Sequence, residues 1–153
     1  MKNYINHIYN NYDKIIYLDT ETTGLSYDSK IVEIAIINYV GEILLNTLVN
    51  PEMPIPLTSS KIYNITNDMI IDLSLFKNLI PKIELIFKNK IIIIYNSEYD
   101  TNILESNGLN MTGYNIEYAM KLFATFYGDY SNSYKNYRYH KLDMTYYYCT
   151  NKI

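Results

Sequence analysis

The chain has 153 residues, which is long enough for one domain with a hydrophobic core of its own. Hydrophobic residues make up 48% and charged residues 19%, a balance that is typical of a globular protein and excludes a disordered one. The net charge of −3 excludes a global basic field, so any contact with phosphate groups must be local or depend on metal ions.

The cellular setting is predicted from cysteine usage and hydropathy. Cys149 is the single cysteine, which excludes an intrachain disulfide framework and favours a reducing compartment. The first residues are too polar for a signal peptide, and the longest apolar runs are too short to cross a bilayer. We therefore expect a soluble, cytoplasmic protein without a membrane partner.

Tyrosine is unusually frequent, with 19 residues and no tryptophan. Exposed tyrosines could form a surface on which nucleic-acid bases stack. Tyr, Asn, Ile and Lys also share AT-rich codons, and we favour this biased codon usage as the explanation.

The first half of the chain predicts a polar lead-in over residues 1–13 and a single domain over residues 14–153. A short buried strand covers residues 14–18 and ends at an acidic pair. Two further apolar runs are separated by Gly41, which indicates a hairpin of residues 31–40 and 42–49. Prolines 51, 54 and 56 then end strand structure.

The second half alternates between helix and strand. Residues 66–69 have polar N-cap choices, and residues 75–87 have apolar residues at helical spacing. Pro81 falls inside that span, so the helix either begins near it or kinks there. The run IIII predicts a buried strand over residues 91–94. Helices are expected over residues 98–104 and 118–126 and from about residue 142, with a polar loop before the last one. This order predicts an α/β domain with one mixed sheet.

The acidic pair lies in the stretch IYLDTETTGL, where Asp19 and Glu21 follow an apolar run. On a strand, residues i and i+2 point to the same side, so these two like charges repel each other unless a cation lies between them. Hard divalent ions such as Mg²⁺ take carboxylate oxygens as ligands. The pair therefore predicts a metal site at the end of the first strand.

A second acid occupies an equivalent place. Asp100 follows the 91–94 strand, near the start of a helix, and the carboxyl ends of strands are where open α/β sheets build their sites. Taken alone, Asp100 is more simply explained as a first-turn acid that offsets the helix dipole. Together with Asp19 and Glu21 it could hold one or two metal ions, which suits phosphodiester displacement.

Three segments resemble the proofreading-type 3′→5′ exonucleases, the DEDD or DnaQ-like group of the ribonuclease H-like fold. YLDTETTGL resembles their first motif, and VNPEMPIPLTSSKIYNITNDMI resembles the segment "NP…PIP…HGIT", with Tyr63-Asn64 in place of His-Gly. IIIIYNSEYDTNIL resembles the second motif, with Tyr95 in place of His and Tyr99 in place of Phe. The resemblance covers residues from about 14 to the end.

The resemblance implies a ribonuclease H-like sheet flanked by helices, and a role for several residues. Asp19, Glu21 and Asp100 would be catalytic and would hold two Mg²⁺ or Mn²⁺ ions. The residues expected to bind the terminal nucleotide are Thr22, Thr23, Gly24, Leu25, Ile65, Asn96 and Tyr99.

The family also has a fourth carboxylate, in a third motif written as His, four residues, Asp or as Tyr, three residues, Asp. Tyr139 and Asp143 satisfy the second form, which would make Asp143 a metal ligand and Tyr139 or His140 the general base. The residues around Tyr139 and Asp143 instead resemble the structural segment that precedes the third motif in this family. We favour this alignment, on which the domain is C-terminally truncated at Ile153, before the catalytic helix.

These observations leave two kinds of function open. The leading hypothesis is a metal-dependent 3′→5′ exonuclease acting on single-stranded DNA or RNA ends, weak or inactive because the fourth carboxylate is missing. The alternative is a non-catalytic module that keeps the fold and binds nucleic acid or protein. A homo-oligomer in which a neighbouring subunit completes the site is a further possibility.

Overall fold

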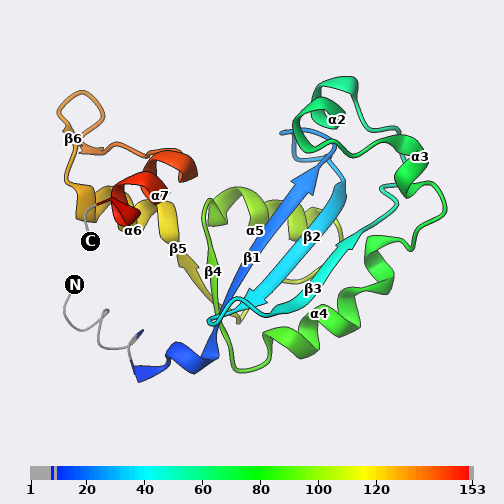
Figure 1. Cartoon of the computed structure of the whole chain (residues 1–153), viewed down its shortest axis with the longest axis horizontal. Coiled ribbons are helices and arrows are strands. Elements are labelled where there is room, and N and C mark those ends of the chain that lie inside the picture. The colour runs from blue at the N-terminus through cyan, green and yellow to red at the C-terminus, as the bar shows by residue number, and fades with distance from the viewer. Residues whose placement is uncertain (1–7, 9, 152–153) are drawn as a thin grey trace.

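The protein is built around a five-stranded mixed sheet, seen in a computed structural model that describes residue 8 and residues 10–151 (Figure 1). The strand order is β3-β2-β1-β4-β5. The first three strands form an antiparallel meander, whereas β4 and β5 run parallel to β1. The strands of this sheet are β1 (Ile15–Thr22), β2 (Ile31–Asn38), β3 (Ile43–Leu48), β4 (Ile91–Ile94) and β5 (Asn115–Tyr118).

Helices fill the connections after the meander. The segment between β3 and β4 contains three α-helices and one short 3₁₀-helix, and β4 is followed closely by a helix of ten residues. The helical elements are η1 (Tyr12–Lys14), α2 (Leu57–Tyr63), α3 (Asn67–Ile70), η2 (Phe76–Asn78), α4 (Ile80–Phe87), α5 (Ser97–Ser106), α6 (Ala119–Tyr127) and α7 (Leu142–Thr150). No helix within the described part of the chain is long and apolar enough to span a membrane.

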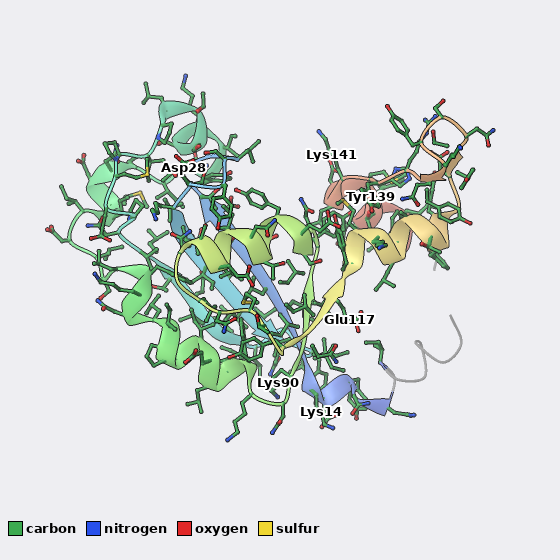
Figure 2. The ribbon with its side chains drawn as sticks, turned by 180° about the vertical axis from the view of Figure 1, so that it is seen from behind. Lys14, Asp28, Lys90, Glu117, Tyr139 and Lys141 are labelled. Atoms are coloured by element: carbon green, nitrogen blue, oxygen red, sulfur yellow. The ribbon has the colours of Figure 1, made fainter. Side chains whose placement is uncertain are left out.

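The main core lies between one face of the sheet and helices α4 and α5. Figure 2, seen from behind, shows α5 in front of the strands, with α4 along the edge of the sheet. Alternate strand residues such as Ile16, Leu18 and Ile36 point into this core and meet Ile83 and Leu104 of the helices. The residues of β1 that alternate with these point to the opposite face of the sheet. That face is only partly covered.

A lobe beside β5 consists of α6, a small hairpin and α7. The hairpin strands β6 (Tyr130–Ser131) and β7 (Asn136–Tyr137) pair antiparallel. Inside the lobe, the Tyr127 ring packs edge-on against the rings of His140 and Tyr148, at centroid distances of 4.7 and 4.8 Å. Figure 1 shows the lobe at the left, away from α2 and α3.

Tyr95, at the carboxyl end of β4, ties this lobe to the sheet. Its hydroxyl donates a hydrogen bond to the carbonyl of His140 at 2.7 Å and lies 2.6 Å from the Thr145 hydroxyl. Both partners belong to the start of α7 or the residues just before it. This side chain therefore positions α7 against the carboxyl end of the sheet.

The predicted mixed sheet is confirmed, but several boundaries differ. The first strand does not end at the acidic pair, because pairing with β2 continues through Glu21 and Glu33. Of the two alternatives for residues 75–87, the helix begins near Pro81, at Ile80, since proline fits the first helical turn. Strand β5, helix α2 and the β6–β7 hairpin were not expected. Of the predicted lead-in 1–13, residues 1–7 and 9 lie outside the described residues.

We expect Tyr95→Phe to lower the free energy of unfolding by about 1–3 kcal/mol. The change removes two hydrogen bonds, each worth about 0.5–1.5 kcal/mol. Urea unfolding monitored by circular dichroism measures the loss. Tyr17→Phe is the matched control, because the Tyr17 hydroxyl has no hydrogen-bond partner among the described residues and should leave the midpoint unchanged. Equal midpoints for both variants would contradict a tethering role.

Candidate active site

Asp19 and Glu21 lie on the partly covered face of the sheet, near the carboxyl end of β1. The burial of β1 alternates, with Thr20 and Thr22 buried against the helices and the two acids on the opposite side. Glu33 of β2 is directly opposite Glu21 in the strand register. Three carboxylates therefore share one small area of this face.

Asp100 reaches the same strand from the helix side of the sheet. It lies in the first turn of α5 and is only 4% exposed. Its Oδ1 accepts a hydrogen bond of 2.7 Å from the hydroxyl of Thr20, the residue between the two acids of β1. The structure thus places Asp100 next to β1, and the shared binding of a cation by the three acids stays a prediction.

Electrostatic repulsion connects these acids. Burial, followed by the charges of Asp19 and Glu33, raises the pKa of Glu21 to about 7, while a hydrogen bond from Tyr63 opposes the shift and Asp100 adds to it. Burial, and then the charge of Asp19, raises the pKa of Asp100 to about 6, against the lowering effect of Thr20. The pKa of Asp19 is raised by burial. Each carboxylate therefore carries its charge at a cost.

This donor set fits a divalent cation in its chemistry. Carboxylates that repel one another are neutralised by Mg²⁺ or Mn²⁺, which prefer oxygen ligands. Asp100 is hydrogen-bonded on the helix side, however, whereas Asp19 and Glu21 point to the other side. Within the described ranges, no three His, Cys, Asp or Glu side chains already stand close enough together to hold a metal ion.

The loop after β1 is fixed by Tyr99, the neighbour of Asp100. The Tyr99 hydroxyl lies 2.7 Å from the Thr22 hydroxyl and donates to the Gly24 carbonyl at 2.7 Å. A side chain at Gly24 would meet the Ser29 hydroxyl at 3.3 Å, so the loop is tightly packed there. This packing leaves Leu25 85% exposed at the tip of the loop. Thr22, Gly24 and Tyr99, three of the predicted substrate residues, are in direct contact.

The other predicted substrate residues have structural partners. Thr23 is buried, and its carbonyl accepts a hydrogen bond from Ser59 of α2 at 2.9 Å. Ile65 is buried in a small cluster with Val32, Ile55 and Ile70. The Asn96 side chain accepts a hydrogen bond from the Tyr118 hydroxyl at 2.8 Å. Their contact with a nucleotide stays a prediction.

The three candidates for the third motif lie in the lobe. Tyr139 is exposed and its ring packs against Tyr118 at 5.9 Å. The His140 ring belongs to the aromatic cluster, and its Nε2 is buried without a hydrogen-bond partner among the described residues. Asp143 is exposed in the first turn of α7, and its Oδ1 accepts a hydrogen bond from the Met144 amide at 2.7 Å. Roles for these residues as base or metal ligand stay predictions.

Two residues of the site were not predicted from the sequence. Glu33 acts on Glu21 from the neighbouring strand, and Tyr63 approaches it from the end of α2. The predicted hairpin around Gly41 does not specify how β2 pairs with β1. The position of Glu33 opposite Glu21 depends on the register of that pairing, which the sequence pattern does not give. Tyr63 stands where the resembled family has His. This replacement was the feature of the sequence that could have identified Tyr63 as a site residue.

An apolar cavity of about 390 Å³ adjoins the acids. It lies between the partly covered face of the sheet and the start of α7. Its lining includes Tyr17, Ala35 and Ile93 from three strands and Leu142 from α7, with Asp19 at its edge. Of the acids, Asp19 is therefore bordered by apolar surface on this side, which strengthens electrostatic interactions near it.

We expect the stability of the protein to depend on pH through Glu21 and Asp100. Because their pKa values are raised in the folded state, the folded state holds these protons more tightly than the unfolded state. The resulting stability is present at about pH 4 and is lost as the pH rises through about 6 and about 7. In EDTA, the melting temperature should therefore fall between about pH 5 and about pH 8.

The same measurement of melting temperature tests whether the acids bind a divalent cation. Millimolar Mn²⁺ at about pH 8 should restore part of the lost melting temperature, because the ion replaces the protons. Asp100→Asn should reduce the pH dependence to the part that Glu21 contributes, whereas Glu105→Gln, at an exposed acid on the same helix, should keep it in full. A drop of the same size in wild type and Asp100→Asn would show that this carboxylate is not involved.

Comparison with known proteins assigns the chain to a family. Residues 16–151 match the family model RNase_T, described as exonuclease. The uncharacterized exonuclease CP81 of Escherichia phage 186 is 36% identical over 140 residues, which is 85% of this chain and 72% of that protein. DNA polymerase III subunit epsilon of Buchnera aphidicola subsp. Schizaphis graminum is 31% identical over 105 residues, 62% of this chain and 45% of that protein.

A solved structure supports the same assignment at the level of the fold. Exonuclease X, in complex with 5′ overhanging duplex DNA, superposes with a TM-score of 0.66 at 24% identity. The match covers 90% of this chain and 73% of that one. The predicted ribonuclease H-like fold, with a mixed sheet flanked by helices, is thereby confirmed. The chain belongs to the RNase_T exonuclease family, within the DnaQ-like group that its sequence resembles.

Proposed function

We propose that this protein is a metal-dependent 3′→5′ exonuclease that acts on single-stranded ends of DNA or RNA. The observation that carries this proposal is the placement of Asp19 and Glu21 on one face of β1, with Asp100 hydrogen-bonded to Thr20 between them. Repelling carboxylates at a strand end are costly without a cation and suit a site that uses one. Family membership and the DNA bound by exonuclease X support the substrate class.

The proposed roles follow from the position of each side chain. Asp19 and Glu21 would hold the cations on the partly covered face, and Asp100 would join them by exchanging its Thr20 hydrogen bond for a metal contact. Bound Mg²⁺ or Mn²⁺ supplies stabilisation of the attacking and leaving oxygens. The loop fixed by Tyr99 would orient the terminal nucleotide, with Leu25 exposed beside it.

Slow turnover is part of the proposal. Asp143 is exposed and accepts a hydrogen bond from its own helix, so it is not held toward the other acids by any contact that the structure describes. Without a fourth carboxylate and a positioned base, the rate should be lower by about 10²- to 10⁴-fold. We therefore expect binding of a strand to be easier to detect than cleavage, unless a partner subunit supplies the missing acid.

A non-catalytic binding module is the second candidate. It is favoured by one observation, namely that the acids of the described residues do not form a ready ligand set. In this case the open face and the loop would hold a nucleic-acid end or a protein without hydrolysis. The two candidates share a fold, so only an activity measurement separates them.

The decisive experiment follows a 5′-labelled single strand incubated with Mn²⁺ or with EDTA. A 3′→5′ exonuclease produces a ladder of shortened labelled strands that is absent in EDTA. Asp19→Asn should reduce the rate by at least about 100-fold. Loss of a residue that only supports a metal ligand costs up to about 100-fold, and loss of the ligand itself should cost no less.

Asp143→Asn tests the remaining question, with Asp68→Asn as its control. Asp68 is also an exposed acid in the first turn of a helix, α3, on the other side of the molecule. If Asp143→Asn abolishes cleavage and Asp68→Asn does not, Asp143 is the fourth ligand. The same background in wild type and Asp19→Asn would favour the binding module.

A further inference from the structure

We propose that the β6–β7 hairpin and its flanks, residues 129–141, form a second contact for a single strand of nucleic acid, outside the acidic site. This inference rests on the proposed function, since it concerns the same substrate. It goes beyond that function by assigning a separate surface that would hold the strand away from its reacting end.

Charge singles out this segment. Residues 129–141 contain three cations, Lys135, Arg138 and Lys141, and one acid, Asp129, whereas the whole chain has a net charge of −3. All three cations are exposed. The ion pair between Arg138 and Asp129 has a length of 4.0 Å, and 61% of the Arg138 side chain is exposed, so this pair is weak and leaves the guanidinium available.

The same segment displays aromatic rings. Tyr130, Tyr137 and Tyr139 are exposed, and Tyr134 at the hairpin turn is 83% exposed. Tyr130 and Tyr137 pair across the two strands, edge to face, with ring centroids 5.4 Å apart. Such a pair keeps each ring in a fixed orientation at little entropic cost on binding.

A hollow combines the two kinds of side chain. It has a volume of about 660 Å³, within the range of small-molecule sites. Its lining residues are Ser131, Tyr134, Asn136, Tyr137, Arg138 and Tyr139. Three phenol rings and a guanidinium around one concave surface match the alternation of base and phosphate along a strand.

The lobe that carries the hairpin is joined to the acid-bearing part of the sheet through α7, with the hairpin at the outer end of the lobe in Figure 1. Tyr95 ties the backbone at His140 to the end of β4, and Leu142 and Thr145 line the cavity that Asp19 borders. Figure 2 shows Tyr139 and Lys141 in this lobe, whereas Lys14 and Lys90 lie at the opposite end of the sheet. A strand that enters the acidic site could therefore continue over the hairpin.

Unpaired bases are the predicted partner, because ring stacking requires faces that a duplex keeps covered. A duplex would meet only the three cations. This difference separates a single-strand surface from general attraction to phosphate, and it determines the design of the test.

The charge contribution is measured with the double variant Lys135→Gln/Arg138→Gln. Binding of a fluorescent oligothymidylate is followed by anisotropy in EDTA, which prevents cleavage, at several salt concentrations. Each lost phosphate contact should lower the slope of log Kd against log salt by about 0.7. Lys82→Gln/Lys88→Gln, two exposed lysines at α4, is the matched control and should keep the wild-type slope.

The stacking contribution is measured with Tyr134→Ala. Loss of one stacked base should weaken single-strand binding at least about fivefold, the low end of the stacking range, and leave duplex binding unchanged. Tyr39→Ala is the control, because Tyr39 is an exposed ring paired with Tyr12 at 5.2 Å, outside the lobe. Because Tyr134 is at an exposed turn, a folding defect is not expected, and the melting temperature verifies this.

The outcomes separate this inference from the proposed activity. Wild-type affinity in both hairpin variants, or no oligonucleotide binding by the wild type, overturns the inference. A loss restricted to the charge variant, equal for duplex and single strand, also overturns it, because stacking is then absent. Cleavage of a labelled dinucleotide with Mn²⁺, run in parallel, reports on the acidic site alone, so its failure counts against the activity and not against the hairpin.

Discussion

The alternation of side chains along β1 is the constraint on which the rest of the site depends. Thr20 and Thr22 point to the helices, where they form hydrogen bonds with Asp100 and Tyr99, two consecutive residues of α5. Asp19 and Glu21 necessarily point the other way. A shift of one residue in the register of β1 would bury both carboxylates in the core and expose the threonines. The hydrophobic pattern of the strand thus fixes the chemistry of the sheet's other face.

Much of this arrangement could be predicted from the sequence. The two acidic motifs follow apolar runs, and because parallel strands end at one edge of a sheet, the approach of Asp100 to the end of β1, where it bonds Thr20, was predictable. The sequence could not show that Asp100 approaches from the helix side, because the hydrogen bond to Thr20 depends on how α5 packs. Glu33 was missed for a similar reason, since its partner is set by the β1–β2 register.

The lobe was the least predictable part. Strands β5 and β6, of four and two residues, carry too little periodicity to be recognised and lack the continuous apolar run that marks β4. Tyr95 was identified only as a replacement for a family histidine, and its tethering role depends on a backbone carbonyl that no pattern specifies. The many tyrosines were ascribed to codon usage, yet in the hairpin they stand beside the cations of an acidic chain. A biased composition and a binding surface are therefore compatible explanations.

The separation in sequence between the two halves of the site has a consequence for folding. The β1–β2–β3 meander forms between neighbouring segments, whereas Thr20 and Asp100 are 80 residues apart. Contacts of such separation require the closure of a long loop and form late. We expect the acids to come together only after the meander and the parallel strands have paired. A chain emerging from the ribosome would then pass most of its synthesis with its carboxylates still dispersed, too far apart to share a cation.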